Sequence, residues 1–206
     1  NVLRDVFGLK NFKIIEAETE MPGTITIKPT GREFSCNYNA FKIPESRERF
    51  LYALEQSILQ AEKPLLVHVT AFKDLPTMQE AEQLGLSIMT RERLLELQDD
   101  KSGNDIIQFK QAKIPVLYST KCNRGADFPG EMCNSIILTK FPYPAINSIF
   151  WKILRKTKPQ YYDEFYHDKA RREFLQRIYR GLRSRDDHIF LLSPDSRVLA
   201  VNFSDR

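Results

Sequence analysis

The sequence contains little cysteine and little histidine. Three residues of each type occur among 206, and the cysteines (Cys36, Cys122 and Cys133) form no Cys-x-x-Cys pair. An odd number of widely spaced cysteines argues against both a disulfide framework and a zinc ribbon. We therefore expect a reduced, intracellular protein, located in the cytoplasm or nucleoid, or in the nucleus if the source is eukaryotic.

Long hydrophobic runs are also missing. No run approaches the roughly 20 apolar residues that a membrane span needs, so we expect no membrane association. The first residues lack the apolar core of a signal peptide. The sequence begins with Asn1 rather than Met, which leads us to expect a piece of a longer protein.

Two motifs that bind nucleoside triphosphates are absent as well. The sequence has no Gly-x-x-x-x-Gly-Lys-Ser/Thr loop and no Asp-Glu-x-His or Asp-Glu-Ala-His box. The first motif cradles the β- and γ-phosphates and supplies a hydroxyl to magnesium. We therefore do not expect this chain to hold ATP and Mg²⁺ by itself.

The composition is that of a folded protein, with 42% hydrophobic and 28% charged residues. A net charge of +4 permits nucleic-acid binding without demanding it.

Apolar runs alternate with segments of three–four apolar spacing. A continuous apolar run at 64–70 is typical of a strand buried on both faces, and His68 within it is better explained as a core residue than as a ligand. Further strands are expected at 24–28, 87–89, 116–119, 135–139 and 189–192. Helices are expected at 45–61, 74–85, 91–97, 106–113, 146–155 and 161–182. This order predicts an α/β fold, a mostly parallel sheet with helices on both faces.

A basic stretch lies near the end of the last long helix expected. At about 100° per residue, Gln176, Arg180 and Arg183 fall on one side of that helix, while apolar residues occupy the other. Converging guanidinium groups suit an anion with several oxygens, such as a nucleotide phosphate. The alternative is a solvated basic face on a packed helix.

A second stretch favours the phosphate interpretation. The strand at 116–119 runs into a loop with Arg-Gly-Ala-Asp at 124–127, a second strand follows, and then Gln-x-x-x-Arg-x-x-Arg at 176–183. This order resembles motifs V and VI of superfamily 2 helicases. Gly-Ala-Asp-Phe-Pro-Gly at 125–130, Phe-Pro-Tyr-Pro at 141–144 and Leu-Arg-Ser-Arg-Asp-Asp at 182–187 resemble the XPD/DinG group of ATP-dependent DNA helicases. The resemblance is strong from 114 to 197 and weak before 63.

The resemblance implies the second, three-layer RecA-like motor domain over residues 36–206, after an opening segment at 1–35. Arg180 and Arg183 match the arginines that reach the γ-phosphate of ATP, which a first RecA-like domain mainly holds. Gln176 matches the residue that couples nucleotide state to domain closure, and Gly125 and Asp127 match nucleotide-site residues of motif V. ATP and Mg²⁺ would be shared with the first domain. The group's iron–sulfur cluster is not expected here, because its four-cysteine spacing is missing.

The resemblance also implies that single-stranded DNA is a partner. The residues that match DNA-binding positions are Thr70, Phe72, Ser119, Thr120, Lys121 and Arg124. Two simpler interpretations remain open: Thr70 as the cap of the following helix, and Lys121 as a solvated loop lysine.

Two positions depart from the group's pattern. Tyr179 stands where glycine is usual, and Arg124 stands where glutamate is usual. Tyr179 favours an alternative function, a non-catalytic RecA-like module that binds DNA or a repair protein. The aromatic cluster at 161–166 could stack on DNA bases, but its three–four spacing favours a core role.

Overall fold

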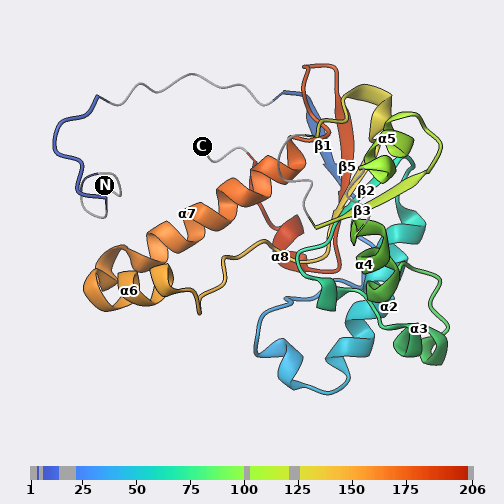
Figure 1. Cartoon of the computed structure of the whole chain (residues 1–206), viewed down its shortest axis with the longest axis horizontal. Coiled ribbons are helices and arrows are strands. Elements are labelled where there is room, and N and C mark those ends of the chain that lie inside the picture. Colours follow the sequence, from blue (N-terminus) through green and yellow to red (C-terminus); the bar gives the residue numbers. More distant parts are fainter. Residues whose placement is uncertain (1–3, 5–6, 14–21, 100–102, 121–125, 204–206) are drawn as a thin grey trace. The chain divides into compact units, whose positions relative to one another are not determined.

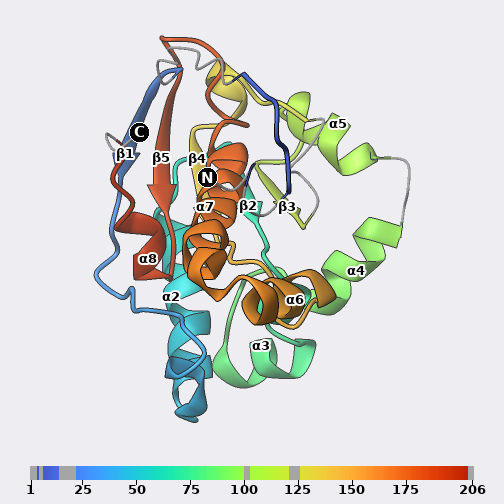
Figure 2. The same ribbon diagram turned by 90° about the vertical axis from the view of Figure 1, so that its left-hand side faces the viewer.

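The computed structural model describes residues 4, 7–13, 22–99, 103–120 and 126–203. Its sheet has five parallel strands in the order β1-β5-β4-β2-β3, which Figure 2 shows side by side. The strands are β1 (Thr24–Ile27), β2 (Leu65–His68), β3 (Val116–Ser119), β4 (Ser135–Leu138) and β5 (His188–Leu192). The α/β class and the parallel sheet are confirmed.

The helices alternate with these strands (Figure 1). The α-helices are α2 (Ser46–Gln60), α3 (Met78–Leu84), α4 (Arg91–Asp99), α5 (Asn104–Lys110), α6 (Ile149–Thr157), α7 (Pro159–Ile178) and α8 (Ser196–Leu199). Short 3-10 helices are η1 (Ala40–Lys42), η2 (Phe72–Asp74) and η3 (Gly130–Met132). None of the helices in the described part of the chain combines the length and apolarity that crossing a membrane requires.

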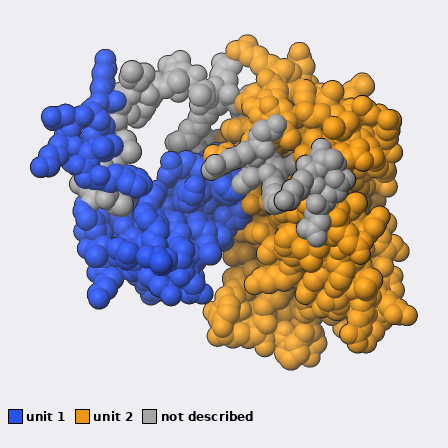
Figure 3. Space-filling view, in the orientation of Figure 1, with its two compact units in different colours: residues 1–21, 142–175 blue, residues 22–141, 176–206 orange. Residues whose placement is uncertain are grey.

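The chain divides into two compact units (Figure 3). Residues 1–21 and 142–175 form the first unit, and residues 22–141 and 176–206 form the second, which contains the sheet. The predicted boundary at residue 36 stays a prediction. β1, from the opening segment, is an edge strand of the sheet.

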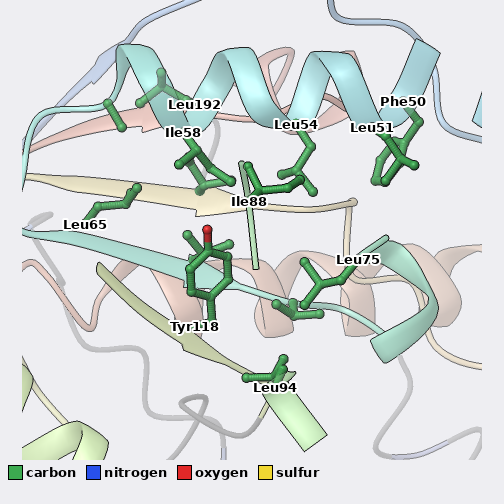
Figure 4. Close-up of a cluster of buried hydrophobic side chains, with 14 of the residues drawn as sticks. Phe50, Leu51, Leu54, Ile58, Leu65, Leu75, Ile88, Leu94, Tyr118 and Leu192 are labelled. Atoms are coloured by element: carbon green, nitrogen blue, oxygen red, sulfur yellow. The ribbon is translucent and has the colours of Figure 1, made fainter. Parts of the chain in front are cut away.

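The core of the second unit lies between the sheet and α2. Phe50, Leu51, Leu54 and Ile58 project from one side of α2, and all four are buried against apolar residues of the strands and loops (Figure 4). This is the face that the three–four spacing of 45–61 predicts. Each fully buried side chain of this size stabilises the fold by roughly 1.5–3 kcal/mol.

The first unit has a small aromatic core of its own. Trp151 and Leu154 from α6 pack with Phe165 from α7, and the partly buried rings of Tyr162 and Tyr166 complete the cluster. Tyr162 and Tyr166, one helical turn apart, stack with centroids 5.8 Å apart. The structure thus places these aromatic residues in a packed cluster, as their spacing favours.

Two expected elements differ. Residues 87–89 form no strand; they connect α3 to α4, and Ile88 enters the core there. α7 ends at Ile178, four residues before the end predicted at 182. Gly181 explains the early end: an added Cβ would lie 2.9 Å from Ile189 Cγ2 and 3.2 Å from Ile136 Cδ1, so this backbone packs directly on the sheet.

Candidate nucleotide site

Arg180 and Arg183 meet at one carboxylate. Arg180 Nη1 lies 2.7 Å from Asp127 Oδ1, and Arg183 Nη2 binds the same oxygen. Because α7 ends at Ile178, the shared helical face predicted for these arginines is wrong. They converge instead because Asp127, from the loop after β3, lies between them.

Main-chain contacts fix this arrangement. Phe128 N donates to Arg180 O at 2.8 Å, and Arg180 Nη1 donates to Ala126 O at 3.3 Å. The side chain of Phe128 is fully buried and meets Phe109 edge-on, with centroids 5.2 Å apart. The segment that carries Asp127 is therefore anchored in the core on both sides.

Asp187 orders the turn that carries Arg183. Its Oδ2 accepts the N–H groups of Arg183 at 2.5 Å and Ser184 at 2.7 Å, and its Oδ1 accepts that of Gly130 at 3.0 Å. The residue is only 6% exposed. Asp187 thus ties the turn after α7 to the loop before β4.

Both carboxylates have lowered pKa values. Burial alone would raise the pKa of Asp127, but the hydrogen bonds from Arg183 and Arg180 outweigh it. Burial would likewise raise the pKa of Asp187, and main-chain N–H groups outweigh it. Both groups are therefore ionised at neutral pH, and Asp127 together with the two guanidiniums carries one net positive charge.

The arginines differ in exposure, since the side chain of Arg180 is 12% exposed and that of Arg183 is 43% exposed. Arg183 is thus the more accessible to an anion from solvent or from another domain. Gln176, on the last turn of α7, is exposed. Gly125, Lys121 and Arg124 lie outside the described residues.

The residues expected to contact DNA have contacts within the protein. Thr70 Oγ1 donates to Lys140 O at 3.0 Å and accepts from Arg177 Nη1 at 3.4 Å. Phe72 packs against the core, Ser119 is buried, and Thr120 donates to Gln98. The N-cap of η2 is Ala71, and its N–H is bound by the Asp74 side chain, so Thr70 is not the cap.

His68 is a core residue, as its position in an apolar run predicts. Its Nε2 lies 3.2 Å from Arg177 O, and the ring is 2% exposed. Burial, together with the charge of Arg177, lowers its pKa to about 3. His68 is therefore neutral at physiological pH and links the end of β2 to the end of α7.

The sequence analysis missed three features of this region: Asp187, Arg177, and the pair formed by buried Asp74 and partly exposed Lys140. Asp187 could have been found, because it closes the Arg-Ser-x-x-Asp segment that resembles the helicase motif. Arg177 carries no such signal, since neighbouring arginines mask it. Asp74 Oδ1 and Lys140 Nζ lie 2.8 Å apart, and Asp74 Oδ2 accepts a hydrogen bond from Thr139. Both partners lie more than 60 positions from Asp74 in the sequence, so no local pattern predicts these contacts.

The donor set suits phosphate oxygens rather than a metal. Two guanidinium groups converge, and guanidinium matches phosphate geometry. Among the residues that the structure describes, no group of three or more His, Cys, Asp or Glu could hold a metal ion.

The sequence matches the family model described as helicase C-terminal domain over residues 54–206. A search of curated proteins found no match.

Among solved structures, an apo structure of XPD matches with a TM-score of 0.58 and 16% identity, over 97% of this chain and 39% of that chain. Xpd4 of S. tokodaii matches with a TM-score of 0.47 and 17% identity, over 90% of this chain and 37% of that chain. The chain therefore spans about two fifths of the length of these XPD chains. The likeness to the apo XPD structure confirms the RecA-like α/β fold, and the family match confirms the resemblance drawn from motifs V and VI: the chain belongs to the helicase C-terminal domain family.

Proposed function

We propose that this chain is the second motor domain of an ATP-dependent DNA helicase. In this proposal, ATP and Mg²⁺ are held mainly by a first RecA-like domain, and Arg180 and Arg183 complete the site. ATP binding closes the cleft between the domains, and hydrolysis allows it to reopen. This cycle moves single-stranded DNA. The observation that carries the proposal is the meeting of both arginines at Asp127.

Asp127 supports the arginines in two ways. It offsets part of their mutual repulsion, and it holds both side chains in one place before a nucleotide arrives. A triphosphate carries more negative charge and more acceptor oxygens than one carboxylate, so it can compete for the exposed Arg183. Positive charge placed beside the transferring phosphoryl group stabilises the transition state, and such an arginine contributes about 10³–10⁵-fold in kcat.

The test is ATP hydrolysis with and without single-stranded DNA. This chain alone should be inactive, and adding the first motor domain should restore activity. Arg180→Ala and Arg183→Ala should each lower the stimulated rate strongly, with a smaller loss of DNA affinity. Arg185→Ala removes an exposed arginine from the same turn and is the matched control.

A non-catalytic binding module remains the second candidate. One observation favours it: Asp127 already neutralises half of the charge of the two arginines, as a purely structural tie would. The same assay separates the candidates. If both arginine variants hydrolyse ATP at the rate of the Arg185→Ala control, the catalytic assignment fails.

A further inference from the structure

A second basic site lies in the sheet-containing unit, at the carboxyl ends of β2 and β4. It is a cavity of about 460 Å³, within the range of small-ligand sites. Five of its lining residues are cationic: Lys42, Arg47, Lys73, Arg91 and Lys140. None of the described residues that line it is acidic, and it shares no residue with the cluster around Asp127.

The two arginines build the wall of the cavity. Arg47 donates to Lys73 O at 2.9 Å and to Leu75 O at 2.8 Å, and Arg91 donates to Leu75 O at 3.2 Å. Glu80 lies 2.9 Å from Arg47 and 3.9 Å from Arg91. One carboxylate thus contacts both guanidiniums, and these bind main-chain carbonyl groups in and just after η2, the 3-10 helix that carries Lys73.

Lys140 also makes contacts within the protein that occupy its ammonium group. Its ammonium group lies 2.8 Å from buried Asp74 Oδ1 and 4.2 Å from the ring centroid of Phe41. Cys36 adds no negative charge at neutral pH, because burial raises the pKa of its thiol to about 12. Among the described residues, the carboxylates in contact with the five cations are Asp74 and Glu80, which leaves an excess of three positive charges.

Lys42 and Lys73 are exposed, and no ion pair joins either of them to a carboxylate within the described part of the chain. Lys42 Nζ lies 5.0 Å from the ring centroid of Tyr38, which also lines the cavity. Tyr38 is 83% exposed, so much of its ring surface is open to solvent. Lys42 thus covers one face of the Tyr38 ring, and Lys73 lines the same cavity with an exposed ammonium group.

We propose that this cavity binds one nucleotide unit of a single-stranded nucleic acid, with its phosphate between Lys42 and Lys73 and its base stacked on Tyr38. Basic grooves that follow the backbone, combined with aromatic platforms for the bases, are the general means of binding single strands. This inference rests on the proposed function in one respect, the choice of a nucleic-acid strand as the ligand. It assigns strand binding to residues that the motif comparison did not select.

The test is binding of a short fluorescein-labelled oligothymidylate to this chain, measured by anisotropy over a range of KCl concentrations. Each lost phosphate contact weakens single-strand binding about five-fold at about 0.1 M salt and lowers the salt slope by about 0.7. Because the two lysines share one phosphate, Lys42→Ala combined with Lys73→Ala should bind roughly five-fold more weakly, with a slope lower by about 0.7. Arginine at both positions should restore binding.

The matched control is Lys63→Ala combined with Lys113→Ala. These exposed lysines precede β2 and β3, at the amino-terminal ends of the strands and therefore on the side away from the cavity. The control should bind as the wild type does. Tyr38→Ala should weaken binding between about five-fold and a hundred-fold, and Tyr38→Phe should not. An abasic strand should not distinguish these Tyr38 variants.

Equal affinity and equal salt slope in the two lysine double variants would overturn the proposal. Loss of ATP binding in the Lys42/Lys73 variant, with strand binding intact, would also overturn it and identify a free-nucleotide site. Neither outcome depends on hydrolysis. A failure here is therefore distinguishable from a failure of the Arg180 and Arg183 assignment, which the ATPase assay decides.

Discussion

Asp187→Asn is the substitution that best tests how the turn carrying Arg183 is held. Asparagine has nearly the same shape, so its carbonyl oxygen can keep the bonds from Arg183 N and Ser184 N. Its NH₂ group then faces Gly130 N–H, donor against donor. The variant loses one hydrogen bond to a charged group, worth about 1.5–3 kcal/mol, and leaves a donor without an acceptor at a further cost of about 1–3 kcal/mol.

We expect Asp187→Asn to lower the free energy of unfolding by about 3 kcal/mol at neutral pH, since partial relaxation offsets some of this cost. With a urea dependence of about 2 kcal/mol per molar, the midpoint should fall by about 1.5 M. Asp186→Asn is the matched control, because it removes the same charge from the exposed neighbouring residue. If both variants unfold at the same urea concentration, Asp187 does not anchor the turn.

The pH dependence gives an independent check. The folded pKa of Asp187 is lowered, so its contribution to stability is fully present above the unfolded value of about 3.9 and is lost as pH falls through the folded pKa. The stability gap between wild type and Asp187→Asn should therefore be constant at neutral pH and narrow below about pH 4. A gap that stays constant in acid would refute the charge-based explanation.

Three further predictions concern the core. His68 has a folded pKa of about 3 against about 6.5 when unfolded, so its contribution to stability is lost as pH falls below about 6.5. Between pH 7 and pH 5, urea unfolding of the wild type should lose about 2 kcal/mol more than His68→Gln, and equal losses would contradict the burial argument. Burial raises the pKa of the Cys36 and Cys133 thiols to about 12. Peptide-resolved mass spectrometry should find both unmodified by iodoacetamide in the folded protein and alkylated in urea; rapid native labelling would show that they are accessible. Gly181→Ala should lower the free energy of unfolding by about 1–3 kcal/mol, because the new methyl group meets two isoleucine side chains on the sheet; an unchanged urea midpoint would mean that these side chains can move aside.

The strands were predictable because their signal is local. The run at 116–119 matches β3, and the run at 64–70 contains β2, since a strand buried on both faces has to be apolar throughout. Helix α2 was predictable for a similar reason, because its buried side follows from the three–four spacing of apolar residues within the helix itself. The end of α7 was not. It depends on contacts of Gly181 with β4 and β5, and propensity alone continues the helix to Leu182.

The arginine pair shows where helical periodicity fails to predict how two side chains meet. Helical periodicity placed Arg180 and Arg183 on one face, yet both lie beyond the helix. What brings them together is Asp127, more than 50 positions earlier in the chain. The motif resemblance selects Asp127 together with both arginines, whereas periodicity considers only one element at a time.

The basic cavity lies beyond both kinds of reasoning. Its cations come from η1, α2, η2, α4 and the second residue after β4, and no short motif contains them. Their spacing in sequence gives no sign that Arg47 and Arg91 bind the same main-chain carbonyl group, that of Leu75. That shared contact separates the arginines, which shape the loop, from Lys42 and Lys73, which remain available. The composition is only mildly basic and does not by itself predict strand binding. The hypothesis follows from the structure, which separates the cations that bind the main chain from those that are exposed in the cavity.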